Sequence, residues 1–171
     1  MDALKERIRH VPDFPKPGIL FYDVTTLLGD REGFGLAIDA MLKPHKPGSI
    51  DLVVGIESRG FIFGAAMADR LKVGFAPVRK PGKLPSKTRS ASYSLEYGKD
   101  SLEVHEDAAA KGQRVLIVDD LLATGGTANA TIELVKKIGG EVVGACFVIE
   151  LSFLPGRKRL EPVETFSLIQ Y

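Results

Sequence analysis

Cysteine is almost missing from this 171-residue chain, which also has no tryptophan. With one cysteine an intrachain disulfide is impossible, so a covalent cross-link cannot hold the fold together. Cys146 lies in the apolar run 142–149, where a cysteine acts as a small hydrophobic residue, and we expect it to be buried. Because 44% of the residues are hydrophobic, a domain of this length can build its core without such a cross-link.

The chain also lacks an excess of charge of either sign. Lysine and arginine number 23 against 22 aspartate and glutamate, which leaves a net charge of +1. Such a balance gives no long-range field for nucleic acid or an anionic membrane. No apolar stretch approaches the roughly 18 residues of a membrane span, and charges occupy residues 2–7, where a secretory signal would need apolar residues. We expect a soluble cytoplasmic protein with no nucleic-acid or membrane partner.

Several common site patterns are missing as well. Neither the Walker spacing nor the G-x-G-x-x-G fingerprint occurs, which disfavours those two nucleotide-binding folds. His10, His45 and His105 show no spacing typical of a metal site. No serine lies in a G-x-S-x-G context, so hydrolase chemistry is unsupported.

Short apolar runs alternate with helical stretches over most of the chain. Continuous apolar runs predict strands at 51–56, 73–78, 114–118 and 141–149, and helical spacing predicts helices at 32–43, 61–71 and 127–138. This order predicts an α/β fold: an open, mainly parallel twisted sheet flanked by helices, with the chemistry on the loops after the strands.

The remaining segments are less regular. Residues 2–10 have helical composition and end at a proline-rich cluster, so we expect a helix followed by an extended arm. Residues 79–99 lack helical periodicity and predict a long loop or ribbon. The chain then forms one domain over 1–171, with an N-terminal arm at 1–30, a core at 31–171 and a flexible loop at about 80–100.

The most informative segment is 115–127, in which four apolar residues end in two aspartates and a small-residue turn enters a helix. Glycines let the backbone approach an anion, threonines add hydroxyl donors, and a helix N-terminus supplies partial positive charge. These features predict a phosphate-binding loop. Asp119 and Asp120 would repel phosphate but could accept hydrogen bonds from a ribose diol, directly or through Mg²⁺. The alternative is that the aspartates only end the strand while the glycines make a bend.

This Asp-Asp-x-x-x-Thr-Gly-Gly-Thr pattern resembles the phosphoribosyl pyrophosphate signature of the type I phosphoribosyltransferases. The resemblance extends from the proline-rich arm to residues 166–171 and implies the fold of that family. It implies that Asp119 and Asp120 bind the ribose hydroxyls and that Mg²⁺ is bound mainly through the substrate, near these two residues and with no protein ligand assigned. The implied 5′-phosphate loop consists of Ala123, Thr124, Gly125, Gly126 and Thr127.

Residues 55–61 also lie between an expected strand and helix, so they should open on the same sheet edge. The guanidinium of Arg59 suits phosphoryl oxygens and can reach pyrophosphate, although an exposed arginine at a helix start is the simpler interpretation. By resemblance this is the pyrophosphate loop, formed by Glu57, Ser58 and Arg59, with a cis peptide between Glu57 and Ser58. The resemblance gives Arg59 a catalytic role as well.

The run 79–85, Arg-Lys-Pro-Gly-Lys-Leu-Pro, concentrates three cations. Basic runs are usually solvated surface. This one, however, looks like the run in family members that act on adenine, where such cations assist pyrophosphate, in part across a dimer interface. The resemblance therefore implies that Lys83 and Arg79 bind pyrophosphate and that the protein is a homodimer in which Arg79 serves the neighbouring subunit.

Residues 91–98 are similar to the flexible catalytic loop of the same family members. Glu96 is its key acid, either for proton transfer from the purine or for stabilising a ribose cation. Loop closure would keep water away from that cation. Without the resemblance, Glu96 would be an exposed residue of an ordinary hairpin.

The arm at 12–23 should choose the base. Phe21 could stack on a purine ring, although core packing is the usual role of a lone phenylalanine. The resemblance implies a hood that reads the base through Leu20, Phe21 and Tyr22, largely by backbone groups, with Leu151 lining the base pocket.

The resemblance thus implies a pentosyltransferase of purine salvage that converts adenine and phosphoribosyl pyrophosphate to AMP and pyrophosphate. One alternative is a transferase for hypoxanthine, guanine or xanthine. Another is a regulator that senses phosphoribosyl pyrophosphate while binding DNA, which would need a DNA-reading domain or a basic face.

Overall fold

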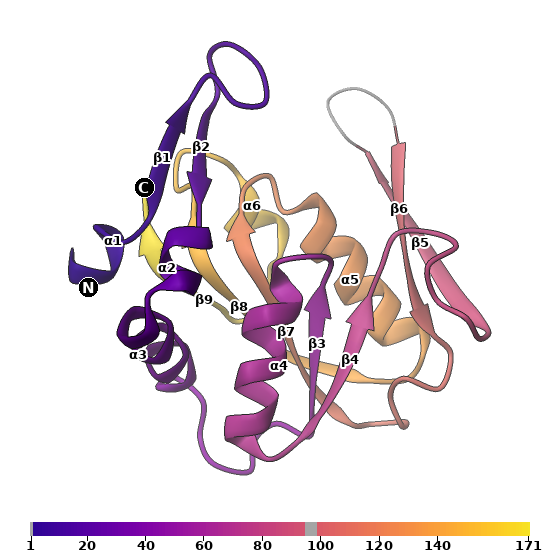
Figure 1. Ribbon diagram of the computed structural model, residues 1–171. Helices are drawn as coiled ribbons and strands as arrows, with labels where there is room; N and C mark the ends of the chain where they lie inside the picture. Colours follow the sequence, from indigo (N-terminus) through magenta and orange to yellow (C-terminus); the bar gives the residue numbers. More distant parts are fainter. Residues whose placement is uncertain (1, 95–98) are drawn as a thin grey trace.

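The fold is built on a five-stranded sheet in which every pairing is parallel, seen in a computed structural model that describes residues 2–94 and 99–171 (Figure 1). The expected open, mainly parallel sheet is confirmed. Its spatial order is β4-β3-β7-β8-β9. The strands are β3 (Leu52–Ile56), β4 (Gly74–Val78), β7 (Arg114–Leu122), β8 (Glu141–Glu150) and β9 (Thr165–Gln170).

Two helical layers cover the sheet, which explains why its strands read as continuous apolar runs. In β3 all five residues are buried, and they alternate between the layers: Val53 packs into one core cluster, Leu52 and Val54 into the other. Helices α3 (Arg31–Leu42) and α4 (Gly60–Leu71) contribute to the first cluster, and α5 (Gly126–Lys137) contributes to the second. Cys146 is fully buried in the first cluster, as expected.

A capping side chain and left-handed backbone set the bounds of the predicted helices. Asp30 accepts a hydrogen bond from the amide of Gly33 at 2.7 Å and so begins α3 one residue before the predicted start. The chain leaves α4 at Lys72, whose φ of 58° is left-handed. The end of α5 is followed by Gly139, with φ of 95°, at the predicted glycine stop.

The predicted helix over residues 2–10 is wrong for most of its length. Helix α1 (Asp2–Lys5) ends after one turn, and β1 (Arg9–Pro12) pairs antiparallel with β2 (Leu20–Asp23). The pairing sets His10 opposite Tyr22, and the two rings pack edge-on with centroids 5.1 Å apart. This contact is available to the strand and not to an isolated helix. The resulting hairpin rises above the carboxyl end of the sheet in Figure 1, and α2 (Thr25–Gly29) follows it.

A second antiparallel strand pair overlaps residues 79–99, the segment predicted as a loop or ribbon. Strands β5 (Thr88–Ser94) and β6 (Lys99–His105) pair antiparallel. Ala91, Leu102 and Val104 are buried beside α5, which gives this ribbon an apolar face and fixes its position. The predicted catalytic residue Glu96 belongs to residues 95–98, which lie outside the described part of the chain.

The short helix α6 (Gly156–Arg159) lies between β8 and β9. Within residues 2–94 and 99–171, no helix has the length and apolar character that crossing a membrane requires.

Candidate active site

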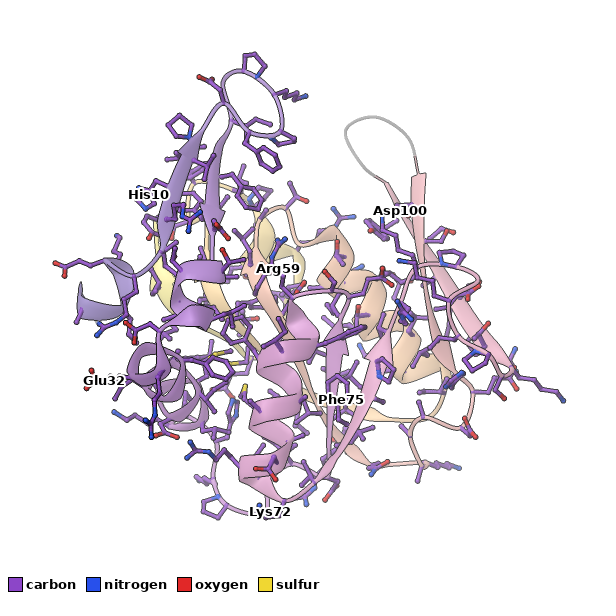
Figure 2. All side chains as sticks on the ribbon, in the orientation of Figure 1. His10, Glu32, Arg59, Lys72, Phe75 and Asp100 are labelled. Atoms are coloured by element: carbon purple, nitrogen blue, oxygen red, sulfur yellow. The ribbon has the colours of Figure 1, made fainter. Side chains whose placement is uncertain are left out.

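A cleft of about 370 Å³ opens at the carboxyl edge of the sheet. Its walls come from the loops after β3 and β7, from the start of α5 and from the β5–β6 hairpin. Figure 2 shows Arg59 and Asp100 at this same end of the molecule, to which β3 and β7 point in Figure 1. The lining residues are Glu57, Ser58, Arg59, Lys80, Tyr93, Asp100, Leu102 and the continuous segment 119–128.

The N-terminus of α5 faces this cleft without a side-chain cap. Gly125 precedes the helix with φ of 76° and makes no side-chain cap hydrogen bond. A Cβ atom on Gly125 would lie 2.8 Å from the carbonyl oxygen of Gly156, so only glycine lets the loop pack this tightly against α6. The amides of the first turn and the helix dipole are of the kind that can bind an anion. All five predicted phosphate-loop residues line the cleft.

Asp119 and Asp120 lie at the mouth of the phosphate loop and are 9% and 6% exposed. Asp119 Oδ1 accepts a hydrogen bond from the Asp120 amide at 2.9 Å, and Asp120 Oδ2 pairs with Arg59 Nε. Burial, followed by repulsion from the Asp120 carboxylate, raises the pKa of Asp119 well above its ordinary value. Two carboxyl groups with acceptor atoms toward the cleft suit a vicinal diol.

The loop after β3 supplies the second wall. Its peptide bond between Glu57 and Ser58 is cis, as the resemblance implies, and Arg59 stands at the start of α4. The Arg59 guanidinium lies 5.4 Å from the ring centre of Phe21 while it pairs with Asp120. Arg59 therefore connects Asp120 to Phe21, the predicted base-stacking residue.

The predicted pyrophosphate cations are held by a carboxylate. Glu57 pairs with Lys83 Nζ and with Arg79 Nε, the latter at 3.3 Å, and accepts the Lys80 amide at 2.8 Å. These partners lower the pKa of Glu57 against the opposing effect of its burial. Neither Arg79 nor Lys83 is among the lining residues of the cleft, whereas Glu57 is. In this structure Arg79 and Lys83 do not line the cleft themselves but pair with Glu57, which does.

Sequence reasoning missed three polar lining residues, Lys80, Tyr93 and Asp100. Lys80 Nζ lies 3.1 Å from Asp100 Oδ2, and Tyr93 Oη donates to the same oxygen at 3.1 Å. Burial raises the pKa of Tyr93, and the neighbouring Thr127 side chain acts against this rise. Lys80 was visible in the basic run, but Tyr93 and Asp100 come together only through the hairpin register.

The predicted base-binding residues form a separate group around the first hairpin. Phe21 is half-buried with Phe14 edge-on at 5.1 Å, and Leu20 is exposed. Tyr22 is buried and its ring packs against Tyr171, with centroids 4.1 Å apart, so its side chain faces away from a base on Phe21. Leu151 is half-buried, and its amide donates to the Leu122 carbonyl at 2.9 Å. None of these four lines the cleft described above.

A directly bound metal finds little support in the side chains. Across 2–94 and 99–171, no three histidine, cysteine, aspartate or glutamate residues gather in a group that could hold an ion. Asp120 is engaged by Arg59, and Asp119 is buried with a raised pKa. The residues present fit Mg²⁺ only if the substrate contributes most of its ligands.

An open parallel sheet, an uncapped helix after a paired-aspartate strand end and an arginine across the cleft define a sugar-phosphate-binding α/β domain. The chain matches the phosphoribosyl transferase domain family over residues 32–170, and it belongs to that family.

Individual relatives agree with this assignment over nearly the whole chain. The adenine phosphoribosyltransferase of Acidobacterium capsulatum is 59% identical, with 99% of this chain and 94% of that protein covered. The crystal structure of adenine phosphoribosyltransferase from Rhodothermus marinus has a TM-score of 0.95 at 56% identity and covers 99% and 97% of the two chains. The Saccharomyces cerevisiae enzyme, complexed with adenine and an imino-altritol bisphosphate, has a TM-score of 0.93 at 43% identity over 98% and 97%.

Proposed function

We propose that this protein transfers the phosphoribosyl group of phosphoribosyl pyrophosphate to adenine, which yields AMP and pyrophosphate in purine salvage. The observation that carries the proposal is the uncapped α5 N-terminus beside the buried Asp119–Asp120 pair in one cleft. Relatives named adenine phosphoribosyltransferase, at 59% identity and in solved structures, support the choice of base.

The substrate's 5′-phosphate would sit on the amides and hydroxyls of residues 123–127. The ribose hydroxyls would donate to Asp119 and Asp120, which fixes the sugar next to Arg59. As the anomeric carbon separates from pyrophosphate, positive charge develops on the ribose and negative charge on the leaving group. Fixed charges stabilise both without reorganising, and N9 of adenine attacks the ribose carbon.

Charge counting supports Mg²⁺ as the cofactor. The described lining residues include two cations, Arg59 and Lys80, against four carboxylates. A polyanionic substrate that binds in a cleft lined by more negative than positive side chains needs added positive charge. Mg²⁺ bound to the diphosphate oxygens would supply it and would neutralise charge on the leaving group.

Base recognition would fall to the β1–β2 hairpin as a hood. The Phe21 ring lies next to the Arg59 guanidinium. A purine stacked on the Phe21 ring would therefore lie close to the ribose carbon that it attacks. Backbone groups of Leu20, Phe21 and Tyr22 would read the base edge, with Leu151 beside it. Because Tyr22 is buried against Tyr171, only its backbone can take part.

Glu96 would act in proton transfer or in stabilising the ribose cation. Tyr93 on β5 and Asp100 on β6, which flank residues 95–98 in the sequence, both line the cleft, and this supports the role. Glu96 itself lies outside the described residues. Comparing the pH dependence of the rate in the wild type and in Glu96→Gln separates the two roles. If Glu96 transfers a proton, its titration shapes one limb of the wild-type profile, and the variant lacks that limb.

We further propose a cytoplasmic homodimer in which Arg79 serves the neighbouring subunit. Leu36 on α3 and Ile62 on α4 are large apolar residues that are 48% and 44% exposed, and a second copy could cover them. Arg79 lies beside Phe61, the neighbour of Ile62, at 5.9 Å from its ring centre. Light scattering of the purified protein tests this; a monomer at micromolar concentration contradicts it.

The decisive test is product formation. The protein is mixed with phosphoribosyl pyrophosphate, Mg²⁺ and one purine at a time, and nucleotide and pyrophosphate are measured. Adenine should give AMP, while hypoxanthine, guanine and xanthine should give little product. Preference for another purine would identify a different transferase of the same family. Specific DNA binding in a mobility-shift assay without any turnover would favour the regulatory alternative.

A further inference from the structure

Asp100 is a cleft carboxylate for which the binding scheme above has no use. It lies on β6 directly opposite Tyr93 on β5. Its Oδ2 lies 3.1 Å from Lys80 Nζ and accepts the Tyr93 hydroxyl at 3.1 Å, while its Oδ1 accepts the Ser101 amide at 2.9 Å. Three donors therefore hold one negative charge at the wall of the cleft, in the position labelled in Figure 2.

Both members of the Lys80–Asp100 pair are charged at neutral pH. Lys80 and the Ser101 amide lower the pKa of Asp100, and Asp100 raises the pKa of Lys80. The side chains are 53% and 24% exposed, so the pair is partly screened by solvent and its partners can exchange. Lys80 is therefore available to a phosphoryl group, in competition with Asp100.

The pair differs from the neighbouring contacts of Glu57. Glu57 holds Arg79 and Lys83, which do not line the cleft, whereas Asp100 holds a cation that does. Among the described lining residues, Lys80 and Arg59 are the two cations, and Arg59 is committed to Asp120. Lys80 is therefore the lining cation best placed to exchange its partner for pyrophosphate.

We propose that Asp100 competes with pyrophosphate for Lys80, with which it pairs at 3.1 Å, and that this competition favours release of the product. The inference rests on the proposed function, which makes pyrophosphate the leaving group. A lysine engaged only by pyrophosphate would retain it and slow turnover, since product release often limits an enzyme. A fixed carboxylate that recaptures the lysine lowers the affinity for pyrophosphate.

A purely structural role for Asp100 makes the opposite prediction. If its contribution is only to order Lys80 in advance, losing it raises the entropic cost of binding and weakens pyrophosphate binding. Asp100→Asn separates the two cases, because the amide keeps the size and an acceptor oxygen for Lys80 and Tyr93 while it removes the charge.

The test is calorimetric titration of inorganic pyrophosphate with Mg²⁺ into the full-length protein. We expect the dissociation constant to fall roughly three- to fivefold in Asp100→Asn, the size of a partly screened ion pair, and the gain to shrink at high salt. In steady-state assays the KM for phosphoribosyl pyrophosphate should fall while the KM for adenine is unchanged. Asp100→Ser carries the same expectation for pyrophosphate if Asp100→Asn is not recovered folded.

Glu106→Gln is the matched control. It removes the Arg89–Glu106 pair, at 3.1 Å, from the same hairpin but away from the cleft, and should leave pyrophosphate affinity unchanged. A second comparison introduces Lys80→Gln, which should weaken binding by itself and abolish the gain from Asp100→Asn.

Two results would overturn the proposal: unchanged or weaker pyrophosphate binding in Asp100→Asn, or a gain that persists with Lys80→Gln. The proposed function is tested separately by AMP formation in the wild-type protein. A wild type that forms AMP beside an Asp100→Asn variant that binds pyrophosphate no more tightly defeats only this inference.

Discussion

Replacing Gly125 by alanine tests whether the close packing of residues 123–127 against α6 maintains the cleft. At φ of 76° an alanine costs about 1–2 kcal/mol, because its Cβ crowds the backbone in the left-handed region. The same Cβ would lie 2.8 Å from the oxygen and 3.1 Å from the Cα of Gly156. Both are backbone atoms that cannot rotate away, so the overlap adds roughly 1–3 kcal/mol. We expect a loss of about 2–5 kcal/mol in the free energy of unfolding.

That loss corresponds to a decrease in Tm of roughly 5–15 °C for a chain of this size. The matched control is Gly112→Ala, because Gly112 has φ of 77° but nothing within 4 Å of an added Cβ. The control should lose only the conformational cost, about 1–2 kcal/mol. Urea unfolding measures both variants, and activity assays give the KM for phosphoribosyl pyrophosphate. Only Gly125→Ala should raise that KM, because relief of the overlap moves the loop amides.

Equal losses of stability in the two variants would refute the packing argument. A Gly125→Ala protein that is destabilised but keeps the wild-type KM would show that these amides do not hold the substrate.

Three further predictions use other parts of the structure. Phe21→Ala should raise the KM for adenine roughly tenfold or more through lost stacking, with the KM for phosphoribosyl pyrophosphate unchanged; equal changes in both would contradict the stacking role. Arg114 lowers the pKa of Asp51 to about 2, so this pair stabilises the fold above pH 3.8 and loses its effect as the pH falls toward 2. Asp51→Asn should therefore have a lower urea midpoint than wild type at pH 6, with a difference that narrows in acid; a constant difference would contradict this. Burial raises the pKa of the Cys146 thiol, so Ellman's reagent should modify it only after unfolding, and rapid reaction of native protein would be inconsistent with its position.

The central strands were predictable because burial on both faces leaves a direct trace in the sequence. Strands β3, β7 and β8 are continuous apolar runs, and the glycines after 138 mark the end of α5. The turn between β7 and α5 was predictable for the same local reason, since the aspartates, the turn and the helix start are contiguous. Strand β9 was not predicted as an element, although residues 166–171 belong to the part of the chain that resembles the family.

Features that depend on contacts between distant segments were not predictable from local pattern. Residues 9 and 10 end the stretch that the sequence predicts as a helix, yet they pair with β2 and belong to strand β1. Asp100 looks like an ordinary surface acid until the hairpin register sets it opposite Tyr93 and beside Lys80. Likewise, the basic run shows three cations but not that Glu57 holds Arg79 and Lys83.

The central claim is that residues 123–127 hold the substrate's 5′-phosphate while Asp119 and Asp120 hold its ribose. A crystal structure of the protein with AMP tests this most directly. We expect the phosphate oxygens within hydrogen-bond distance of the amides at the start of α5, with the ribose hydroxyls on the two carboxyl groups and the purine against Phe21. AMP bound elsewhere, with the α5 N-terminus free of phosphate, would contradict the account.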